Sequence, residues 1–476
     1  MTAGSGVSVK PQNSLEPPNR ENSAAFERGA VVELEVEGLI YGGDGVARRD
    51  GLVFFVAGAA PGDLVRAQVA RKKRKHREAR VIEIIKPSPA RTEPRCPHFG
   101  ECGGCKLQHV VYETQLRCKE SHVRDCLQRI GGIADPPVRE ITPMPDPWRC
   151  RNKMEFAFGS GGGGVVLGLH PQGRFDTVID VKQCFLLTPE ASRILETARE
   201  FARRRNLAPY NPRTHEGFLK NLVLRTGGGG GEFMVCIVTT PREFPSADEL
   251  AEAVAACVPR VKSVWWYRNP LVSGVAIAGE ADLLLGKETL SEEISGMKLR
   301  VSPESFMQVN ARQTQALYST IVSFAGLTGT ETALDLYTGA GPIAMLLARS
   351  AKSVTGIESV PEAVRDANLN AAENGIQNVR FLCGQVEKLL PAAAAENPPP
   401  HVVVADPPRA GIHKKVIRAL LDIRPTRLVY VSCNPAALAR DAAALLEGGY
   451  RLADVQPVDM FPHTYHVEAV ALLTAR

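Results

Sequence analysis

The spacing of apolar residues changes along the chain, and each pattern predicts a different kind of structure. Residues 1–28 are polar and rich in Pro, Asn, Ser and Glu, which is typical of a disordered tail. Between Ala30 and Ile85, short stretches of alternating apolar and polar residues are separated by glycine turns. Four or five short strands in so brief a segment indicate a small β-barrel of the oligonucleotide-binding type. The strands we expect read VVELEVEGLI, GLVFFVAG, DLVRAQVARK and EARVIEII.

From about Lys298 onward, apolar stretches of strand length alternate with amphipathic stretches of helical length. Such alternation predicts an α/β domain with a parallel, doubly wound, Rossmann-like sheet. We expect residues 392–400 (AAAAENPPP) to form a loop in it. The expected strands are TALDLY, SVTGIE, VRFLCG, HVVVAD, RLVYVSC and VEAVALLT, and the expected helices include PIAMLLARS, VPEAVRDANLNAAENG and KKVIRALLDI.

A mixed α+β region lies between the barrel and the α/β domain. Its glycine stretches SGGGG and TGGGGG neither follow a strand nor open a helix, so we expect hairpin tips rather than phosphate loops. A chain of 476 residues has room for about three domains. We therefore predict a tail at 1–28, a barrel at 29–90, a central domain at 91–297 and the α/β domain at 298–476.

Basic residues are concentrated near the end of the predicted barrel. The chain has 57 Lys and Arg against 52 Asp and Glu, a net charge of +5, yet residues 66–95 contain eleven basic residues and three Glu. The centre of this segment is RKKRKHR, residues 71–77. A solvated loop is one interpretation, but a basic block on a near-neutral protein also suits a polyphosphate partner, because phosphate contacts release counterions.

No stretch approaches the roughly 18 apolar residues of a membrane span, and the N-terminus lacks the apolar segment of a signal peptide. We therefore expect a cytoplasmic protein, not bound to membranes, and a monomer. Eleven cysteines, an odd number, argue against a disulfide framework and favour ligands or nucleophiles among them.

The first strand–turn–helix unit of the α/β domain, LDLYTGAGPIAMLLA, carries a glycine turn. Gly339 and Gly341 allow the backbone to approach a ligand, and Pro342 suits the first position of a helix. Glu358 ends the next strand, where an acid commonly binds ribose hydroxyls. NAD binding and a purely structural turn would give the same outline, but Asp335 and the motifs that follow favour S-adenosylmethionine.

Three further motifs place reactive side chains at the ends of predicted strands. Asp406 begins DPPRAGI, in which two prolines stiffen the loop. Cys433 follows the strand VYVS at the ligand-binding edge of the sheet, although most apolar-flanked cysteines are inert core residues. Glu468 lies in the apolar strand VEAVALL, where burial would raise its pKa towards that of a general base. An edge-strand Glu that faces water is the alternative.

Five motifs in order resemble those of the bacterial RNA 5-methyluridine methyltransferases, namely CPHFGECGGC, FMQVN, DPPRAGI, SCNPAALARD and HVEAVALL. The resemblance covers nearly the whole chain after the tail. It implies methyl transfer from S-adenosylmethionine to carbon 5 of a uridine in rRNA or tRNA, and a barrel similar to the RNA-binding TRAM domain. RNA cytosine-5 methyltransferases have a cysteine after the proline pair, where this chain has Arg409.

The resemblance also assigns roles to individual residues. It makes Cys433 the nucleophile and Glu468 the base, and it places Phe306 near the target base and Lys153 near the RNA. Pro342 departs from the Asn of many relatives. Gln385 is a weaker candidate for an adenine contact. The residues that match the S-adenosylmethionine site are Gln308, Tyr337, Glu358 and Asp406.

Four cysteines match a ligand pattern. Cys96, Cys102 and Cys105 have the spacing C-x5-C-x2-C, and Cys184 follows in KQCFLL. Relatives with this pattern bind a [4Fe–4S] cluster, so the resemblance implies one here. A structural zinc site and unligated thiols are the alternatives.

Two other functions remain open. A non-catalytic RNA-binding protein with an iron–sulfur or zinc site would leave Cys433, Asp406 and Glu468 without a role. A dehydrogenase is supported only by the glycine turn. The sequence does not tell rRNA from tRNA or identify the uridine.

Overall fold

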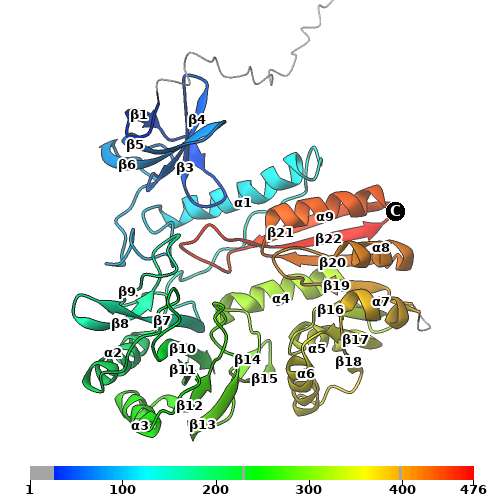
Figure 1. The fold of residues 1–476 in the computed structure, drawn as a ribbon. Helices are drawn as coiled ribbons and strands as arrows, with labels where there is room; N and C mark the ends of the chain where they lie inside the picture. Colours follow the sequence, from blue (N-terminus) through cyan, green and yellow to red (C-terminus); the bar gives the residue numbers. More distant parts are fainter. Residues whose placement is uncertain (1–25, 228–230, 396–398) are drawn as a thin grey trace, which may run out of the picture. The chain divides into compact units, whose positions relative to one another are not determined.

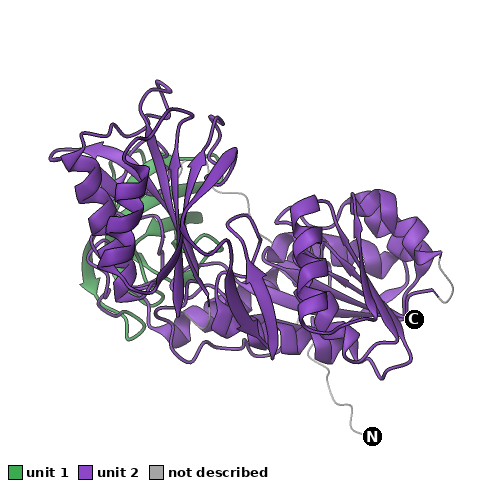
Figure 2. Cartoon of the chain, turned by 90° about the horizontal axis from the view of Figure 1, so that it is seen from below, with its two compact units in different colours: residues 1–91 green, residues 92–476 purple. Residues whose placement is uncertain are grey.

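The computed structural model describes residues 26–227, 231–395 and 399–476, which form two compact units divided between residues 91 and 92 (Figure 2). The tail expected at 1–28 lies almost entirely outside the described residues. The second unit contains both the expected central domain and the expected α/β domain, and the boundary at 297/298 remains a prediction.

The first unit is built on a six-stranded sheet with the order β1-β5-β6-β4-β3-β2. Alternate residues such as Phe54 and Val65 are buried, as the period-2 pattern predicts. The sequence indicated four or five strands and missed β3, because the two arginines of GVARR obscure its alternation. The strands are β1 (Val31–Glu35), β2 (Gly38–Leu39), β3 (Gly45–Arg49), β4 (Leu52–Ala57), β5 (Leu64–Lys72) and β6 (His76–Lys86).

The second unit begins with the cysteine-containing segment and α1 (Tyr112–Arg129), followed by a seven-stranded sheet with the order β13-β12-β11-β10-β7-β8-β9. Apolar residues of α2 and α3 pack with this sheet in one core. SGGGG forms the turn of the β7–β8 hairpin, as predicted, whereas residues 228–230 of TGGGGG lie outside the described part. The elements are β7 (Lys153–Gly161), β8 (Gly164–Leu169), β9 (Ile179–Asp180), α2 (Pro189–Arg204), β10 (Leu219–Gly227), β11 (Glu232–Thr239), α3 (Ala247–Cys257), β12 (Val261–Arg268) and β13 (Glu280–Gly286).

A hairpin, β14 (Leu290–Ile294) and β15 (Met297–Val301), leads into α4 (Ala311–Ala325) and the C-terminal sheet, whose order is β18-β17-β16-β19-β20-β22-β21 (Figure 1). Two hydrophobic cores include its strands. One contains residues of α4 and α5, and the other contains residues of α7, α8, α9 and also α1. The elements are β16 (Thr332–Leu336), α5 (Pro342–Ala348), β17 (Ser353–Glu358), α6 (Pro361–Glu373), β18 (Val379–Cys383), α7 (Val386–Ala394), β19 (Val402–Ala405), α8 (Lys414–Ile423), β20 (Arg427–Ser432), α9 (Pro435–Glu447), β21 (Tyr450–Val458) and β22 (Glu468–Ala475).

The prediction of a parallel, doubly wound sheet is confirmed for β16 to β20 but not for the last two strands. β16 to β20 pair in parallel, but β22 is antiparallel to both β20 and β21. The sequence missed β21, because a register shift near Asp454 and a proline at position 457 break its alternation. The prediction of a loop at 392–400 is also wrong at its start, because α7 continues to Ala394. Residues 396–398 lie outside the described residues.

This topology brings the ends of several strands to one edge of the sheet. Parallel strands end on the same side, so the residues after β16, β17, β19 and β20 share that edge. Because β22 runs in the opposite direction to β20, its first residue lies where β20 ends, and Ser432 pairs with Ala469. Among the described residues, no helix is long and apolar enough to cross a membrane.

Candidate functional site

The thiol of Cys433 and the carboxylate of Glu468 come from neighbouring strands. Cys433 is half-buried in the loop after β20, and Glu468 opens β22 with only 3% of its surface exposed. β22 lies between β20 and β21, so the alternative of an edge-strand Glu facing water does not hold. The loop at Cys433 is fixed by Asn434, whose side chain accepts a hydrogen bond from the backbone N–H of Ala436 (3.1 Å) as α9 begins.

A buried carboxyl group, that of Glu468, and a half-buried one, that of Asp406, lie near each other beside this thiol. Burial raises the pKa of Glu468 well above its usual value, and the charge of Asp406 raises it further. Burial likewise raises the pKa of Asp406. Gln308 donates from Nε2 to Oδ2 of Asp406 at 3.4 Å, which brings the FMQVN segment to the same place. The expected rise in the pKa of Glu468 is therefore confirmed.

Arg409 is a residue of this site that the sequence reasoning did not use as a functional group. Burial and the charge of Glu468 raise the pKa of Cys433, whereas the charge of Arg409 and a hydrogen bond from it lower that pKa. Arg409 also lowers the pKa of Glu468. The sequence feature that could have identified Arg409 is its position in DPPRAG, directly after the two prolines.

The glycine turn after β16 is held by Glu358. Its Oε2 accepts a hydrogen bond from the backbone N–H of Gly339 (3.1 Å), and its Oε1 accepts one from the N–H of Val360 (2.9 Å). Pro342 occupies the start of α5, as predicted. Gly341 has φ +85° and a Cβ there would lie 2.7 Å from the ring of Phe381, so this glycine allows close packing of the turn.

Tyr337 lies at this turn, but its side chain points away from the site. Its φ of 65° is left-handed, and its ring packs in the core that contains residues of α7 and α8. The backbone N–H of His413 donates to its hydroxyl, while burial raises its pKa to about 12. Asp335, near the end of β16, is fully buried and accepts a hydrogen bond from the hydroxyl of Thr338. Burial raises its pKa to about 7, and the charge of Asp406 contributes to the rise.

The remaining expected residues are spread around this edge. Phe306 is 67% exposed, two residues before Gln308. Lys153 opens β7, pairs with Glu155 at 2.8 Å and lines an open groove of about 610 Å³ together with Arg151. Gln385 is exposed and precedes α7.

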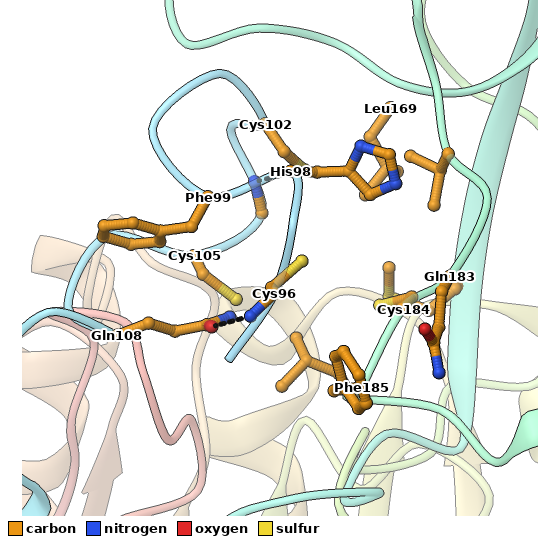
Figure 3. A pocket seen from close by; sticks show the side chains of 14 residues that line it. Cys96, His98, Phe99, Cys102, Cys105, Gln108, Leu169, Gln183, Cys184 and Phe185 are labelled. Carbon is orange, nitrogen blue, oxygen red and sulfur yellow. Dashed lines mark hydrogen bonds between the residues drawn. The ribbon is translucent and has the colours of Figure 1, made fainter. Parts of the chain in front are cut away.

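The four patterned cysteines line one cavity (Figure 3). Cys96, Cys102 and Cys105 lie on the segment before α1, and Cys184 lies on the opposite wall. Burial raises the pKa of Cys105 to about 12 and that of Cys184 to about 11, and the thiols raise each other's values further. The cavity is otherwise lined mainly by apolar side chains and by Gln108, whose Oε1 accepts from the backbone N–H of Cys96 (3.1 Å).

This donor set has the chemistry of a thiolate-ligated metal group. In the described part of the chain, no three Cys, His, Asp or Glu side chains are arranged to hold a metal ion. Cys150, which the sequence gave no role, packs in a small cluster with Cys105 and Cys184.

Comparison with known proteins points to one chemistry. A family model described as tRNA (uracil-5-)-methyltransferase matches residues 274–476, and a TRAM domain model matches residues 25–82. An RNA methyltransferase of Halalkalibacterium halodurans is 41% identical over 453 residues, which are 95% of this chain and 99% of that protein. One from Bacteroides thetaiotaomicron is 39% identical over 91% of this chain and 99% of its own length.

Among solved structures, the tRNA (uracil-54, C5)-methyltransferase of Pyrococcus abyssi in complex with S-adenosyl-L-homocysteine is similar to this chain. The TM-score is 0.74 at 28% identity, and the match covers 93% of this chain and 99% of the other.

Proposed function

Because the chain belongs to the family of S-adenosylmethionine-dependent RNA (uracil-5-)-methyltransferases with an N-terminal TRAM domain, we propose that it methylates carbon 5 of a uridine through a covalent Cys433–uracil adduct. The observation that carries this proposal is the meeting of Cys433 and Glu468 at one edge of the sheet, with Asp406 and Arg409 beside them.

The thiol is needed because carbon 5 of uracil is a weak nucleophile. The Cys433 thiolate adds to carbon 6, and the new C–S bond places electron density on carbon 5 as an enolate. Arg409 favours the thiolate by its positive charge. S-Adenosylmethionine, when bound, supplies the methyl group that carbon 5 takes up by displacement at the sulfonium.

Glu468 completes the reaction. Its carboxylate takes the proton from carbon 5, and the electron pair of that C–H bond re-forms the double bond and expels the Cys433 thiolate. Burial makes this carboxylate a stronger base than an exposed one, which suits abstraction of a carbon-bound proton.

The residues at the glycine turn suit the binding of S-adenosylmethionine. We assign the ribose hydroxyls to Glu358, which is held by backbone N–H groups at the end of β17. We assign Gln308, Tyr337 and Asp406 to the same site, with Tyr337 acting through the shape of the turn because its side chain packs away from it. Gln385 would contact the adenine of the same ligand. Pro342, where many relatives have Asn, would make one contact fewer with this ligand.

The RNA would be held around this edge. The target base must leave its stack to reach Cys433, and the exposed ring of Phe306 offers a stacking partner. Lys153 and Arg151 line the open groove and suit phosphates. The barrel with its basic run would bind RNA without reading its sequence.

We assign a [4Fe–4S] cluster to Cys96, Cys102, Cys105 and Cys184, because four thiols line one largely apolar cavity. When bound, the cluster would tie the segment before α1 to the opposite wall. The four thiols must lose their protons to bind the cluster.

The function is tested by mapping 5-methyluridine in rRNA and tRNA from a strain that lacks this protein. One or more sites should lose the modification, and expression of the wild-type chain, but not of Cys433→Ala, should restore them. Retention of every 5-methyluridine would contradict the proposal, and the RNA class that loses it identifies the substrate.

A further inference from the structure

The loop that leads into Glu468 is mostly buried and contacts helix α1 and the segment that carries the cysteines. It connects β21 to β22 and spans residues 459–467. Asp459 is fully buried, and His463 and Thr464 are each 4% exposed. Thr464 ties the loop to itself, since its hydroxyl donates to the carbonyl of Phe461 (2.8 Å) and accepts from the N–H of His466 (3.2 Å).

A buried ion pair connects helix α1 to the start of this loop. Lys119 Nζ lies 2.6 Å from Asp459 Oδ1, and both side chains are fully buried. Lys119 also donates to the carbonyl of Phe461 (2.9 Å), and the hydroxyl of Tyr112 donates to Asp459 Oδ2 (2.7 Å). Two residues of α1 therefore fix a carboxylate more than three hundred residues later in the chain.

A second contact from α1 holds the middle of the loop. Gln115 Oε1 accepts from the backbone N–H of His463 (3.0 Å), and its Nε2 lies 3.3 Å from Nδ1 of the same residue. His463 has φ +62°, a left-handed conformation that is uncommon for a residue with a side chain. Such a conformation persists only where the surroundings fix it.

The cysteine segment holds the same residue. The backbone N–H groups of Lys106 and Leu107, directly after Cys105, both donate to the carbonyl of His463 at 2.9 Å. The ring of Trp148 stacks on that of His463 with centroids 3.9 Å apart, and Arg95, next to Cys96, lies over Trp148. Figure 1 shows the β21–β22 loop beside the segment that leads into α1.

We propose that Gln115 and Lys119 are positioning residues for Glu468 and that the cysteine site acts on the same loop through Lys106 and Leu107. Filling the cysteine site then stabilises the position of the general base. The inference rests on the proposed function, because it takes Glu468 as the base.

The first test uses Gln115→Met, which keeps the length of the side chain and removes its two contacts with His463 together with its hydrogen bonds to the carbonyls of Leu107 (3.0 Å) and Val110 (2.8 Å). Misplacement of the base should lower kcat about 100-fold. Because the adduct forms before the slowed step, the KM for RNA should fall together with kcat, so that kcat/KM for RNA changes far less than kcat, and the affinity for S-adenosylmethionine should change less than about twofold. Because addition and methyl transfer precede proton abstraction, a methylated protein–RNA adduct should accumulate and survive denaturing electrophoresis.

The matched control is Arg124→Met on the same helix, which removes two bonds to the backbone at Pro136 and Val138 and none to the loop. It should turn over like wild type. Equal losses in both variants, or a loss in Gln115→Met without an adduct, would mean that α1 acts only through stability. Absence of any adduct in Glu468→Gln as well would instead count against the proposed function.

The second test measures hydrogen exchange in the full-length protein with iron bound and after chelation. The amides of residues 459–467 should exchange at least about tenfold faster after iron is removed, whereas amides of β10 and β11 should not change. Equal exchange of 459–467 in both forms would overturn the link to the cysteine site.

Discussion

The side-chain amide of Asn434 donates a hydrogen bond of 3.0 Å to the backbone carbonyl of Arg409. This bond joins the loop after β20 to the loop after β19, and it places the guanidinium of Arg409 beside the thiol of Cys433. There the cation lowers a thiol pKa that burial and Glu468 raise. The two loops therefore influence the pKa of Cys433 together.

The pH dependence of kcat/KM should report this thiol. Because the pKa of Cys433 is raised, most of the thiol is protonated at neutral pH. kcat/KM should therefore rise with pH, by about tenfold per unit, between about pH 6 and 8. A flat profile over this range would show that the thiolate is already formed in the free enzyme.

Replacing Arg409 by Gln removes the group that lowers the pKa of Cys433, so the rise should move to higher pH. The loss of activity should be roughly tenfold at pH 7.5 and smaller at pH 9.5. Arg418→Gln, an exposed residue of α8, is the control and should follow the wild-type profile. An equal loss for Arg409→Gln at both pH values would assign Arg409 a role other than lowering this pKa.

The residues at the edge of the C-terminal sheet where β16, β17, β19 and β20 end could largely be predicted from the sequence, because parallel strands end on the same side. Glu358, Asp406 and Cys433 each stand at or directly after a strand, so their place follows from local patterns alone. The antiparallel direction of β22 could not be predicted without β21, whose alternation is broken near Asp454.

The contacts that fix the loop between β21 and β22 could not be predicted in the same way. The Lys119–Asp459 pair joins residues 340 positions apart, and each looks like an ordinary surface charge in its own segment. The direction of the Tyr337 side chain depends on its left-handed φ, which no pattern in LDLYTG indicates. Long-range pairs and single backbone angles are set by the packed structure.

The salt dependence of RNA binding should locate the basic contacts of the barrel. Lys73, Arg74 and Lys75 are exposed at the β5–β6 turn, whereas Arg77 is buried and donates to the carbonyl of Phe26 (2.8 Å). Replacing the three exposed residues by Gln should reduce the slope of log K against log salt by about 2 to 3. Arg48→Gln on β3, a residue paired with Glu37, is the control. An unchanged slope in the triple variant would mean that the run is only a solvated surface.

The cysteine site should be loaded with iron in protein purified without oxygen. We expect a brown protein with about four iron atoms per chain and an absorbance that bleaches on reduction. Cys105→Ser should lose the iron, whereas Cys383→Ser, an exposed residue of β18, should keep it. A colourless preparation with one zinc per chain would contradict the cluster, and loss of iron in Cys150→Ser would show that this neighbouring thiol also matters.

The central claim, a covalent pathway with separate roles for Cys433 and Glu468, is tested most directly by denaturing electrophoresis of variants with labelled RNA and S-adenosylmethionine. Glu468→Gln should accumulate a methylated protein–RNA adduct, because the thiol adds and the methyl group transfers before the base is needed. Cys433→Ala should form no adduct and no 5-methyluridine, and RNA with 5-fluorouridine should trap the wild-type enzyme, because fluorine does not leave as a proton does. Normal turnover by Glu468→Gln, or an adduct with Cys433→Ala, would contradict the account.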